Sequence, residues 1–544
     1  MKKKGQGILY FLNVFCLLCL CACGNNNPEI NGTGQSEKQE TLQETEESED
    51  MNQNEQQSNG YDALFEGLQL TEGYKALNQT NPLITQRFGA DPYAMVYGDR
   101  VYFYMTADAF EYDAQGNIVE NTYGKIHNIN VISTTDMVNF TDHGSIEAAS
   151  SSGAATWAHN SWAPAAAWKE IDGKPKFFLY FADAGGGIGV LTADSPTGPF
   201  TDPLGKGLIT RQTPNCSDVL WLFDPAVLVD DDGKAYLYFG GGVPEGRVSD
   251  PGTARVVQLG DDMISIVGEP VRIDVPYLFE DSGIHKAGDK YYYTYCSNWQ
   301  VDEAGTATYG FHSAEIVSME SDSPMGPFTV KETILENPGK YFGLYGNNHH
   351  CVFSFQGNWY ITYHTRLLEK TMGIEHGYRS THVDSFTMGE DGTIGKIRQT
   401  QSGREQLSYV DPYEVNRAVN MSSMGGIECV PCDADSEKYG AGNMALGGIN
   451  TGDYVVVKGV DFGEESPTKW SARIRGPQGG SGVIQLRMDK YNGEILGYLP
   501  VEETTAEFSE YTAELTQAVT GVHNLCLIFY GEGYEIESWQ FTKQ

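Results

Sequence analysis

One pattern recurs five times between about residue 85 and residue 390, and it limits the folds that the chain can adopt. Each copy begins with a polar or functional residue, continues through a short apolar strand and a turn containing glycine, and ends in a strand rich in aromatic residues. The copies begin at Asp91, Trp162, Asp224, Glu280 and His349, roughly 55 to 70 residues apart. Such a spacing is enough for a four-stranded blade with its loops. The pattern therefore predicts an all-β fold with a five-bladed β-propeller.

The composition and the length agree with this fold and call for a second unit. The chain has 32 Tyr, 24 Phe, 8 Trp and 63 Gly, a mixture that suits many short strands joined by tight turns. A chain of 544 residues is too long for one ordinary core. After about Asp411 the pattern changes to shorter alternating strands, which are typical of a β-sandwich. We expect the propeller at 61–410 and the β-sandwich at 411–544.

The N-terminus predicts export. Three lysines at positions 2 to 4 precede an apolar run from Ile8 to Leu20, which is short for a membrane span. The run ends in Leu20-Cys21-Ala22-Cys23-Gly24, which resembles the bacterial lipoprotein box. The resemblance implies a signal peptide at 1–22 and a lipid on Cys23, so that an extracytoplasmic protein would be held on the membrane only by this anchor. The alternative is an ordinary signal peptide cut nearby.

The charge of the chain bears on its partners. Residues 23–60 contain few apolar and many acidic residues, so we expect a disordered acidic tether there. The whole chain carries a formal charge of −37. Because such a field repels polyanions, it argues against a nucleic acid partner, whereas a neutral glycan meets no such penalty.

Three carboxylates begin copies of the repeat. In a propeller the innermost strands line a central channel, so the first residues of the copies converge near the axis. Asp91, Asp224 and Glu280 are thereby expected to form a cluster, although a lone aspartate before proline is usually only a turn residue. Clustered carboxylates are costly unless they have a function. Without a Ser or Cys nucleophile motif, they favour acid/base hydrolysis of an acetal.

Residues 80 to 400 resemble glycoside hydrolase family 43, whose members are inverting five-bladed propellers acting on furanosides and xylosides. The stretches that carry the resemblance are Ala90-Asp91-Pro92, Phe223-Asp224-Pro225-Ala226, Phe279-Glu280-Asp281-Ser282 and Asn347-Asn348-His349. Within the family the chain is most similar to the arabinoxylan arabinofuranohydrolases, through Ser133-Thr134-Thr135-Asp136-Met137-Val138-Asn139-Phe140, Ser161-Trp162-Ala163-Pro164 and Phe239-Gly240-Gly241-Gly242-Val243.

The resemblance implies a role for each carboxylate. Asp91 would be the general base that activates water, Glu280 the general acid on the leaving oxygen, and Asp224 the group that tunes and orients the acid. Asp281 is a rival for the acid, but neighbouring side chains on a strand point to opposite faces. His349 matches the histidine that holds a central calcium in this family, largely through waters; a hydrogen-bonded core histidine is the alternative.

Other residues are candidates for contact with the sugar. Trp162 is the first choice for a stacking wall, followed by Tyr93 and Trp299. Arg366 and Arg379 are candidates for reaching sugar hydroxyls. For the aromatic residues the alternative is core packing, and for the arginines it is a solvated or salt-bridged position.

The C-terminal part resembles a family 6 carbohydrate-binding module over most of residues 413 to 544. The module usually supplies calcium carboxylates from a Glu-Ala-Glu stretch, where this chain has Arg417-Ala418-Val419. A structural calcium is therefore in doubt there. Tyr439 and Phe508 are candidate platform aromatics.

The main hypothesis is an exo-acting α-L-arabinofuranosidase that removes side groups from arabinoxylan or arabinan, with plant cell-wall polysaccharide and xylan oligosaccharides as partners. A β-xylosidase or an endo-arabinanase of the same family remains open, because loop length and pocket depth set the specificity. From another class, a lipid-anchored glycan-binding protein without catalysis remains open as well.

Overall fold

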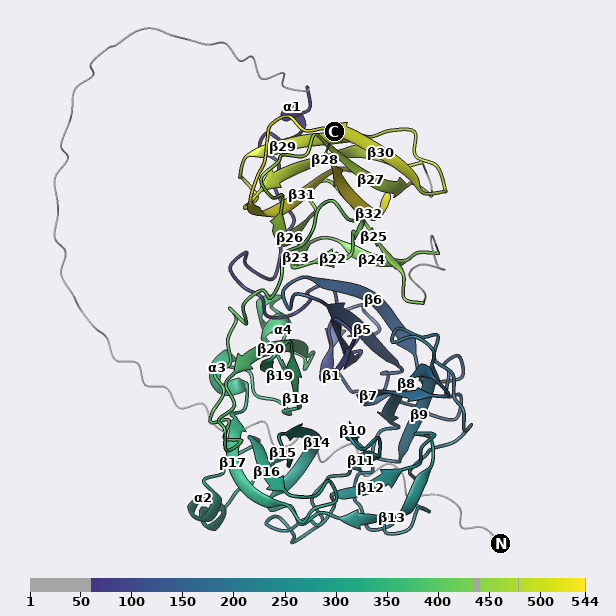
Figure 1. Cartoon of the computed structure of the whole chain (residues 1–544), viewed down its shortest axis with the longest axis vertical. Helices are drawn as coiled ribbons and strands as arrows, with labels where there is room; N and C mark the ends of the chain where they lie inside the picture. The colour runs from purple at the N-terminus through teal and green to yellow at the C-terminus, as the bar shows by residue number, and fades with distance from the viewer. Residues whose placement is uncertain (1–59, 434–440, 478, 544) are drawn as a thin grey trace, which may run out of the picture. The chain divides into compact units, whose positions relative to one another are not determined.

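The computed structural model describes residues 60–433, 441–477 and 479–543, which belong to one compact unit. The predicted signal peptide at 1–22, the predicted lipidation site Cys23 and the predicted tether as far as residue 59 lie outside the described residues. Within the described ranges, no helix combines the length and the apolar character that crossing a membrane requires. The fold is built almost entirely of antiparallel sheets (Figure 1).

Five sheets follow one another between residues 90 and 386 and surround a common centre (Figure 1). This arrangement confirms the predicted five-bladed propeller. In chain order the blades consist of β1 (Ala90–Tyr97), β2 (Arg100–Thr106), β5 (Asn128–Thr134) and β6 (Phe140–Glu147); β7 (Trp162–Ile171), β8 (Lys174–Ala182) and β9 (Ile188–Ala193); β10 (Ala226–Val229), β11 (Ala235–Phe239), β12 (Arg255–Leu259) and β13 (Ile266–Arg272); β14 (Leu278–Ala287), β15 (Lys290–Ser297), β16 (Ile316–Ser321) and β17 (Thr329–Leu335); and β18 (His350–Phe355), β19 (Asn358–Thr365) and β20 (Ser380–Phe386).

The first strands of the blades form a closed ring. Strand β1 contacts β7, β7 contacts β10, β10 contacts β14, β14 contacts β18, and β18 contacts β1 again. The segment before β1 seals the ring along β20, where the Leu83 N–H donates to the Thr381 carbonyl at 2.9 Å and the Gly89 N–H donates to the Arg379 carbonyl at 3.0 Å. Asp91 therefore follows directly on the seam between the first and last blades.

The first strands share an irregularity near their beginnings. Asp91 (φ 46°), Ala163 (φ 44°), Asp224 (φ 49°) and Asp281 (φ 69°) all have positive φ, and the register shifts there in the β1–β2, β7–β8 and β14–β15 pairs. Residues other than glycine rarely adopt this conformation, so its recurrence marks the same structural position in the first strand of four blades. Glu280 stands one residue before its blade's equivalent position, so the prediction that it shares the position of Asp91 and Asp224 is wrong by one residue.

The C-terminal part is a sandwich of two sheets, as predicted. One has the order β24-β25-β32-β27-β30 with β21 beside β32, and the other has the order β23-β26-β31-β28-β29. Their facing sides enclose a core that includes Trp470, Phe529 and Trp539. The strands are β21 (Asn416–Arg417), β23 (Ser423–Gly425), β24 (Glu428–Pro431), β25 (Met444–Gly447), β26 (Tyr454–Asp461), β27 (Lys469–Arg475), β28 (Ser481–Met488), β29 (Ile495–Val501), β30 (Ser509–Glu514), β31 (Val522–Glu532) and β32 (Glu535–Thr542).

The remaining elements are short. Strand β22 (Asn420–Met421) pairs with β6 of the first blade, and β3 (Glu111–Tyr112) pairs with β4 (Ile118–Val119). The helices are α1 (Asp62–Phe65), α2 (Glu303–Tyr309), α3 (Gly339–Phe342) and α4 (Leu367–Thr371). Before the first blade, the segment 61–77 packs apolar side chains against Tyr454, Tyr498 and neighbouring residues of the β23-β26-β31-β28-β29 sheet.

Candidate active site

The three predicted catalytic carboxylates lie where the first strands of blades one, three and four begin. The exposed fractions of Asp91, Asp224 and Glu280 are 5%, 4% and 7%. His349 lies beside the first two, with its Nδ1 at 3.7 Å from Asp91 Oδ1 and 3.9 Å from Asp224 Oδ2. The fourth blade is joined to them because the Asp281 N–H, next to Glu280, donates to Asp224 Oδ2 at 2.8 Å. The ring of blades thus brings the three carboxylates together.

Asp91 is kept ionised by its surroundings. The Arg379 Nη1 donates to Asp91 Oδ1 at 2.9 Å. Burial by itself raises the pKa of Asp91, but the positive charge of Arg379, together with His364 and His349, outweighs burial and holds that pKa well below its usual range. A carboxylate that stays ionised at working pH can accept a proton from water. Asp91 therefore has the properties of a general base.

Glu280 has the opposite environment. Its Oε1 is buried and has no hydrogen-bond partner among the described residues. Burial, followed by the negative charges of Asp224, Asp91 and Asp281, raises the pKa of Glu280 well above its usual range. A carboxyl group that keeps its proton at neutral pH can act as a general acid.

Asp224 and Glu280 interact closely, and the hydrogen bonds indicate which of them holds the proton. Burial and the charge of Asp91 also raise the pKa of Asp224. However, Asp224 Oδ2 accepts the Asp281 N–H at 2.8 Å, and such a bond favours the ionised form. Glu280 Oε1 receives no comparable donor among the described residues. When one proton is bound by the two carboxyl groups, we therefore place it on Glu280.

Asp281, the rival for the acid, is occupied by two histidines. Its Oδ2 lies 2.5 Å from His350 Nδ1, and its Oδ1 lies 3.2 Å from His349 Nε2. The other ring nitrogen of His350 lies 2.7 Å from the Thr294 hydroxyl. Because both of its oxygens are engaged and the residue is fully buried, Asp281 positions the two histidines and is not the general acid.

The comparison with known proteins decides the family. Residues 79–394 match the family described as glycosyl hydrolases family 43, and residues 417–543 match the carbohydrate binding module of family 6. The chain belongs to glycoside hydrolase family 43. It is therefore a glycosidase with a module of family 6 at its C-terminal end.

Relatives within family 43 resemble the chain over most of its length. An arabinoxylan arabinofuranohydrolase of Paenibacillus polymyxa is 45% identical over 86% of this chain and 75% of the relative. An arabinoxylan arabinofuranohydrolase of Bacillus subtilis (strain 168) is 43% identical over 86% of this chain and 94% of the relative. A crystal structure of a family 43 arabinoxylan arabinofuranohydrolase from Bacillus subtilis in complex with cellotetraose has a TM-score of 0.82 at 42% identity, and the match covers 86% of this chain and 99% of that one.

His349, the predicted calcium ligand, is surrounded by carboxylates. The oxygens of Asp91, Asp224 and Asp281 lie 3.2 to 3.9 Å from its ring nitrogens. Oxygen donors are the ligands that calcium prefers. In the part of the chain that the structure describes, no three or more His, Cys, Asp and Glu side chains are grouped so that they could hold a metal ion directly. A calcium held by His349 largely through waters stays a prediction.

Arg379 lies in the site but faces carboxylates. Its Nε and Nη2 donate to the two oxygens of Asp108 at 2.9 and 2.8 Å, and its Nη1 donates to Asp91. The ring of Tyr123 covers the guanidinium at 4.8 Å. The salt-bridged alternative therefore describes Arg379, whose donors are directed at acids and away from the predicted sugar contact. The sequence did not point to Asp108 or Tyr123, since neither begins a repeat.

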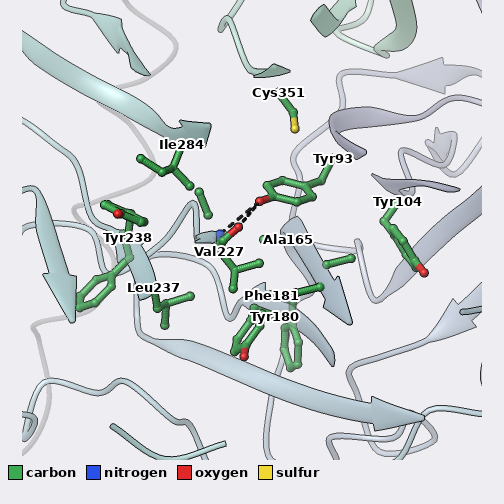
Figure 2. Close-up of a cluster of buried hydrophobic side chains, with 14 of the residues drawn as sticks. Tyr93, Tyr104, Ala165, Tyr180, Phe181, Val227, Leu237, Tyr238, Ile284 and Cys351 are labelled. Atoms are coloured by element: carbon green, nitrogen blue, oxygen red, sulfur yellow. Dashed lines mark hydrogen bonds between the residues drawn. The ribbon is translucent and has the colours of Figure 1, made fainter. Parts of the chain in front are cut away.

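The two leading aromatic candidates have different surroundings. Trp162 is half-buried at the beginning of β7. Its Nε1 donates at 3.0 Å to the carbonyl of Tyr123, the residue whose ring covers the Arg379 guanidinium. Tyr93 instead packs in the propeller core (Figure 2). Its hydroxyl donates to the Val227 carbonyl at 2.8 Å and accepts the Val227 N–H at 3.2 Å. The prediction of Tyr93 as a stacking wall is corrected, because its ring joins blades one and three.

Trp299 and Arg366 lie at the same end of the propeller as the carboxylates. Trp299 is 37% exposed and follows Ser297, which pairs with Leu278 close to Glu280. Arg366 follows the last residue of β19, forms an ion pair with Glu369 and donates to the Tyr345 carbonyl at 3.1 Å. Contact of either side chain with the sugar stays a prediction.

In the C-terminal module, the residues that replace the usual calcium carboxylates are used in packing. Arg417 Nη2 donates to Asn443 Oδ1 at 2.7 Å, while Ala418 and Val419 are buried. The ring of Phe508 lies 4.6 Å from the Arg475 guanidinium. Tyr439, the other candidate platform, lies outside the described residues.

The proton on Glu280 leads to a pH prediction. Because the pKa of Glu280 is raised, its acid form is present below that pKa and is lost as the pH rises through it. The charge of Asp224 contributes to the increase, so Asp224→Asn should move the alkaline limb of kcat/KM to lower pH as well as reduce the rate. A pH profile on a soluble arabinoxylan oligosaccharide, whose leaving hydroxyl needs the proton, measures this shift. An alkaline limb that stays in place would show that Asp224 does not tune the acid.

Proposed function

We propose that the chain is an inverting hydrolase that removes α-L-arabinofuranosyl side groups from arabinoxylan or arabinan. The observation that carries the chemistry is the contrast between Asp91, which accepts a hydrogen bond from Arg379 that holds its pKa low, and the buried Glu280, whose pKa is raised by burial and by the neighbouring carboxylates. The substrate is supported by the similarity to two arabinoxylan arabinofuranohydrolases at 45% and 43% identity.

In the proposed reaction, Asp91 removes a proton from a water molecule that attacks the anomeric carbon. Glu280 donates its proton to the glycosidic oxygen as the bond to the leaving alcohol breaks. Inversion requires the base and the acid on opposite sides of the sugar with room for water, and the two residues come from β1 and β14, on different blades. Asp224 raises the pKa of Glu280, which favours uptake of a new proton from solvent by Glu280 after each turnover.

The proposal also covers the C-terminal module, a calcium ion and the attachment of the enzyme to the membrane. The C-terminal module, which matches family 6, is proposed to bind the same polysaccharide. His349 is proposed to hold a calcium ion through waters; calcium would contribute positive charge near the carboxylates. The lipoprotein-like sequence around Cys23 supports export and anchoring on the bacterial membrane.

Activity on two chromogenic substrates tests the proposed specificity. The purified full chain should hydrolyse 4-nitrophenyl α-L-arabinofuranoside with a kcat/KM at least about 100-fold above that on 4-nitrophenyl β-D-xyloside, a difference of about 3 kcal/mol in transition-state binding. The reverse preference would favour a β-xylosidase. Release of oligosaccharides from linear arabinan would favour an endo-arabinanase. Binding to arabinoxylan without hydrolysis of any of these substrates would favour a glycan-binding protein.

A further inference from the structure

A pocket of about 480 Å³ lies away from the carboxylates, between the segment 70–82, helix α4 and the β-sandwich. Its wall includes three tyrosines, Tyr74, Tyr454 and Tyr491. The rings of Tyr454 and Tyr491 have their centroids 4.6 Å apart. Tyr454 is buried and its ring is tilted by 58° to that of Tyr491. The half-buried Tyr74 and Tyr491 therefore supply the apolar part of the wall, against which a sugar ring can stack. The volume lies within the range of small-molecule sites.

The polar part of the wall is neutral. Gln79 and Gln401 face each other and share a hydrogen bond of 2.5 Å, and Thr371 contributes a hydroxyl from the end of α4. Among the described residues that line the pocket, none carries a carboxylate, although the whole chain has 73 acidic residues. Amides and hydroxyls both donate and accept hydrogen bonds, as sugar hydroxyls require.

Lys75 is the charged residue of the lining, and its ammonium is used by the fold. The Nζ donates to the carbonyls of Pro82 and Leu83 at 2.9 and 3.0 Å. Burial lowers the pKa of Lys75 well below its usual value. An anionic ligand would therefore find little free positive charge, and a neutral ligand fits the wall better.

The pocket is held in shape by the segment that forms one side of it. The Thr71 N–H donates to the Gly452 carbonyl at 2.9 Å, and the Thr71 hydroxyl donates to Asp453 Oδ1 at 2.6 Å. On the other side, the Thr80 N–H donates to the Gln401 carbonyl at 3.2 Å. A site whose walls are fixed before binding costs less ordering entropy when a ligand enters.

We propose that this pocket is a second glycan site, which binds a short stretch of a neutral pentose oligosaccharide separately from the carboxylates. The choice of a pentose rests on the proposed function. The site would keep the polymer on the enzyme while the carboxylates act on its side groups. Such a second contact raises retention on a polymer without changing hydrolysis of a small aryl glycoside.

Isothermal titration of the full chain with xylohexaose and with linear α-1,5-arabinohexaose tests the proposal. The Glu280→Gln variant serves as the background, so that the ligands stay intact whether or not the proposed function holds. We expect more binding events for at least one ligand than the carboxylates and the C-terminal module account for. Thr371→Arg, which fills the pocket from an exposed position, should weaken one of them by at least about tenfold. The double variant Gln79→Ala/Gln401→Ala should weaken the same event by removing its polar partners.

Thr329→Arg is the matched control, because it adds the same side chain at an exposed position of β17. With the native Glu280, Thr371→Arg should leave kcat/KM on 4-nitrophenyl α-L-arabinofuranoside within about twofold of the Thr329→Arg value. Binding events of both ligands that Thr371→Arg and Thr329→Arg leave equally strong would overturn the proposal. Failure of the proposed function would instead appear as absent hydrolysis by the native chain.

Discussion

Asp91→Asn should lower kcat on arabinoxylan by about 10³- to 10⁴-fold, the upper part of the range for loss of a general base. The amide is nearly isosteric with the carboxylate, but it cannot take a proton from water. It also keeps an oxygen that can accept the Arg379 Nη1–H, which Asp91 Oδ1 accepts at 2.9 Å. We therefore expect loss of the chemical step with little change in substrate binding, so that kcat falls and the Kd for an arabinoxylan oligosaccharide stays within about threefold.

Asp99→Asn provides the control for this change. Asp99 is exposed in the turn between β1 and β2, on the same hairpin as Asp91, and its replacement should leave kcat unaltered. Initial rates and equilibrium binding of both variants give the comparison. If Asp91→Asn retained more than about a tenth of the native kcat, another group would have to be the base.

Glu280→Gln should have an effect that depends on the leaving group. On arabinoxylan, whose leaving sugar hydroxyl needs a proton, kcat should fall by about 10³-fold because the glutamine cannot supply one. On 4-nitrophenyl α-L-arabinofuranoside, whose nitrophenolate leaves without protonation, the loss should be about tenfold or less. The alkaline limb of the pH profile should disappear in the variant, since the group with the raised pKa has been removed.

Asp281→Asn separates this role from that of the neighbouring residue. Asp281 pairs with His350 and His349 inside the ring, so its loss should reduce stability and activity on both substrates alike. The opposite result would make Asp281 the general acid and Glu280 a supporting residue. That result is an equal loss on the polymer and the aryl glycoside for Glu280→Gln, together with a loss confined to the polymer for Asp281→Asn.

The repeat in the sequence was enough to predict the propeller and the meeting of the three carboxylates. Asp91 and Asp224 each precede a proline and an apolar strand, so their place in the blade could be read from local pattern. The place of Glu280 could not, because β14 has an additional register shift, between Leu278 and Glu280, that β1 lacks and that strand alternation does not count. The four residues with positive φ became visible only in the backbone.

The supporting residues depend on contacts between distant parts of the chain. Arg379 and Asp108 are 271 residues apart and meet through the seam between the last and first blades. Nothing near Asp108 or Tyr123 in the sequence resembles the repeat start. The stacking role predicted for Tyr93 was wrong because its side chain points into the propeller core, where its hydroxyl donates to the Val227 carbonyl of blade three (Figure 2).

The anomer released first from an α-L-arabinofuranoside tests the central claim most directly, because the separate roles of Asp91 and Glu280 require inversion at the anomeric carbon. Proton NMR of the native chain during the first minutes of hydrolysis, before mutarotation, distinguishes the two anomers. We predict that β-L-arabinofuranose appears first and that the α anomer grows in later. Initial release of the α anomer would mean retention through a covalent intermediate and would contradict the assignment of Asp91 as a base acting on water.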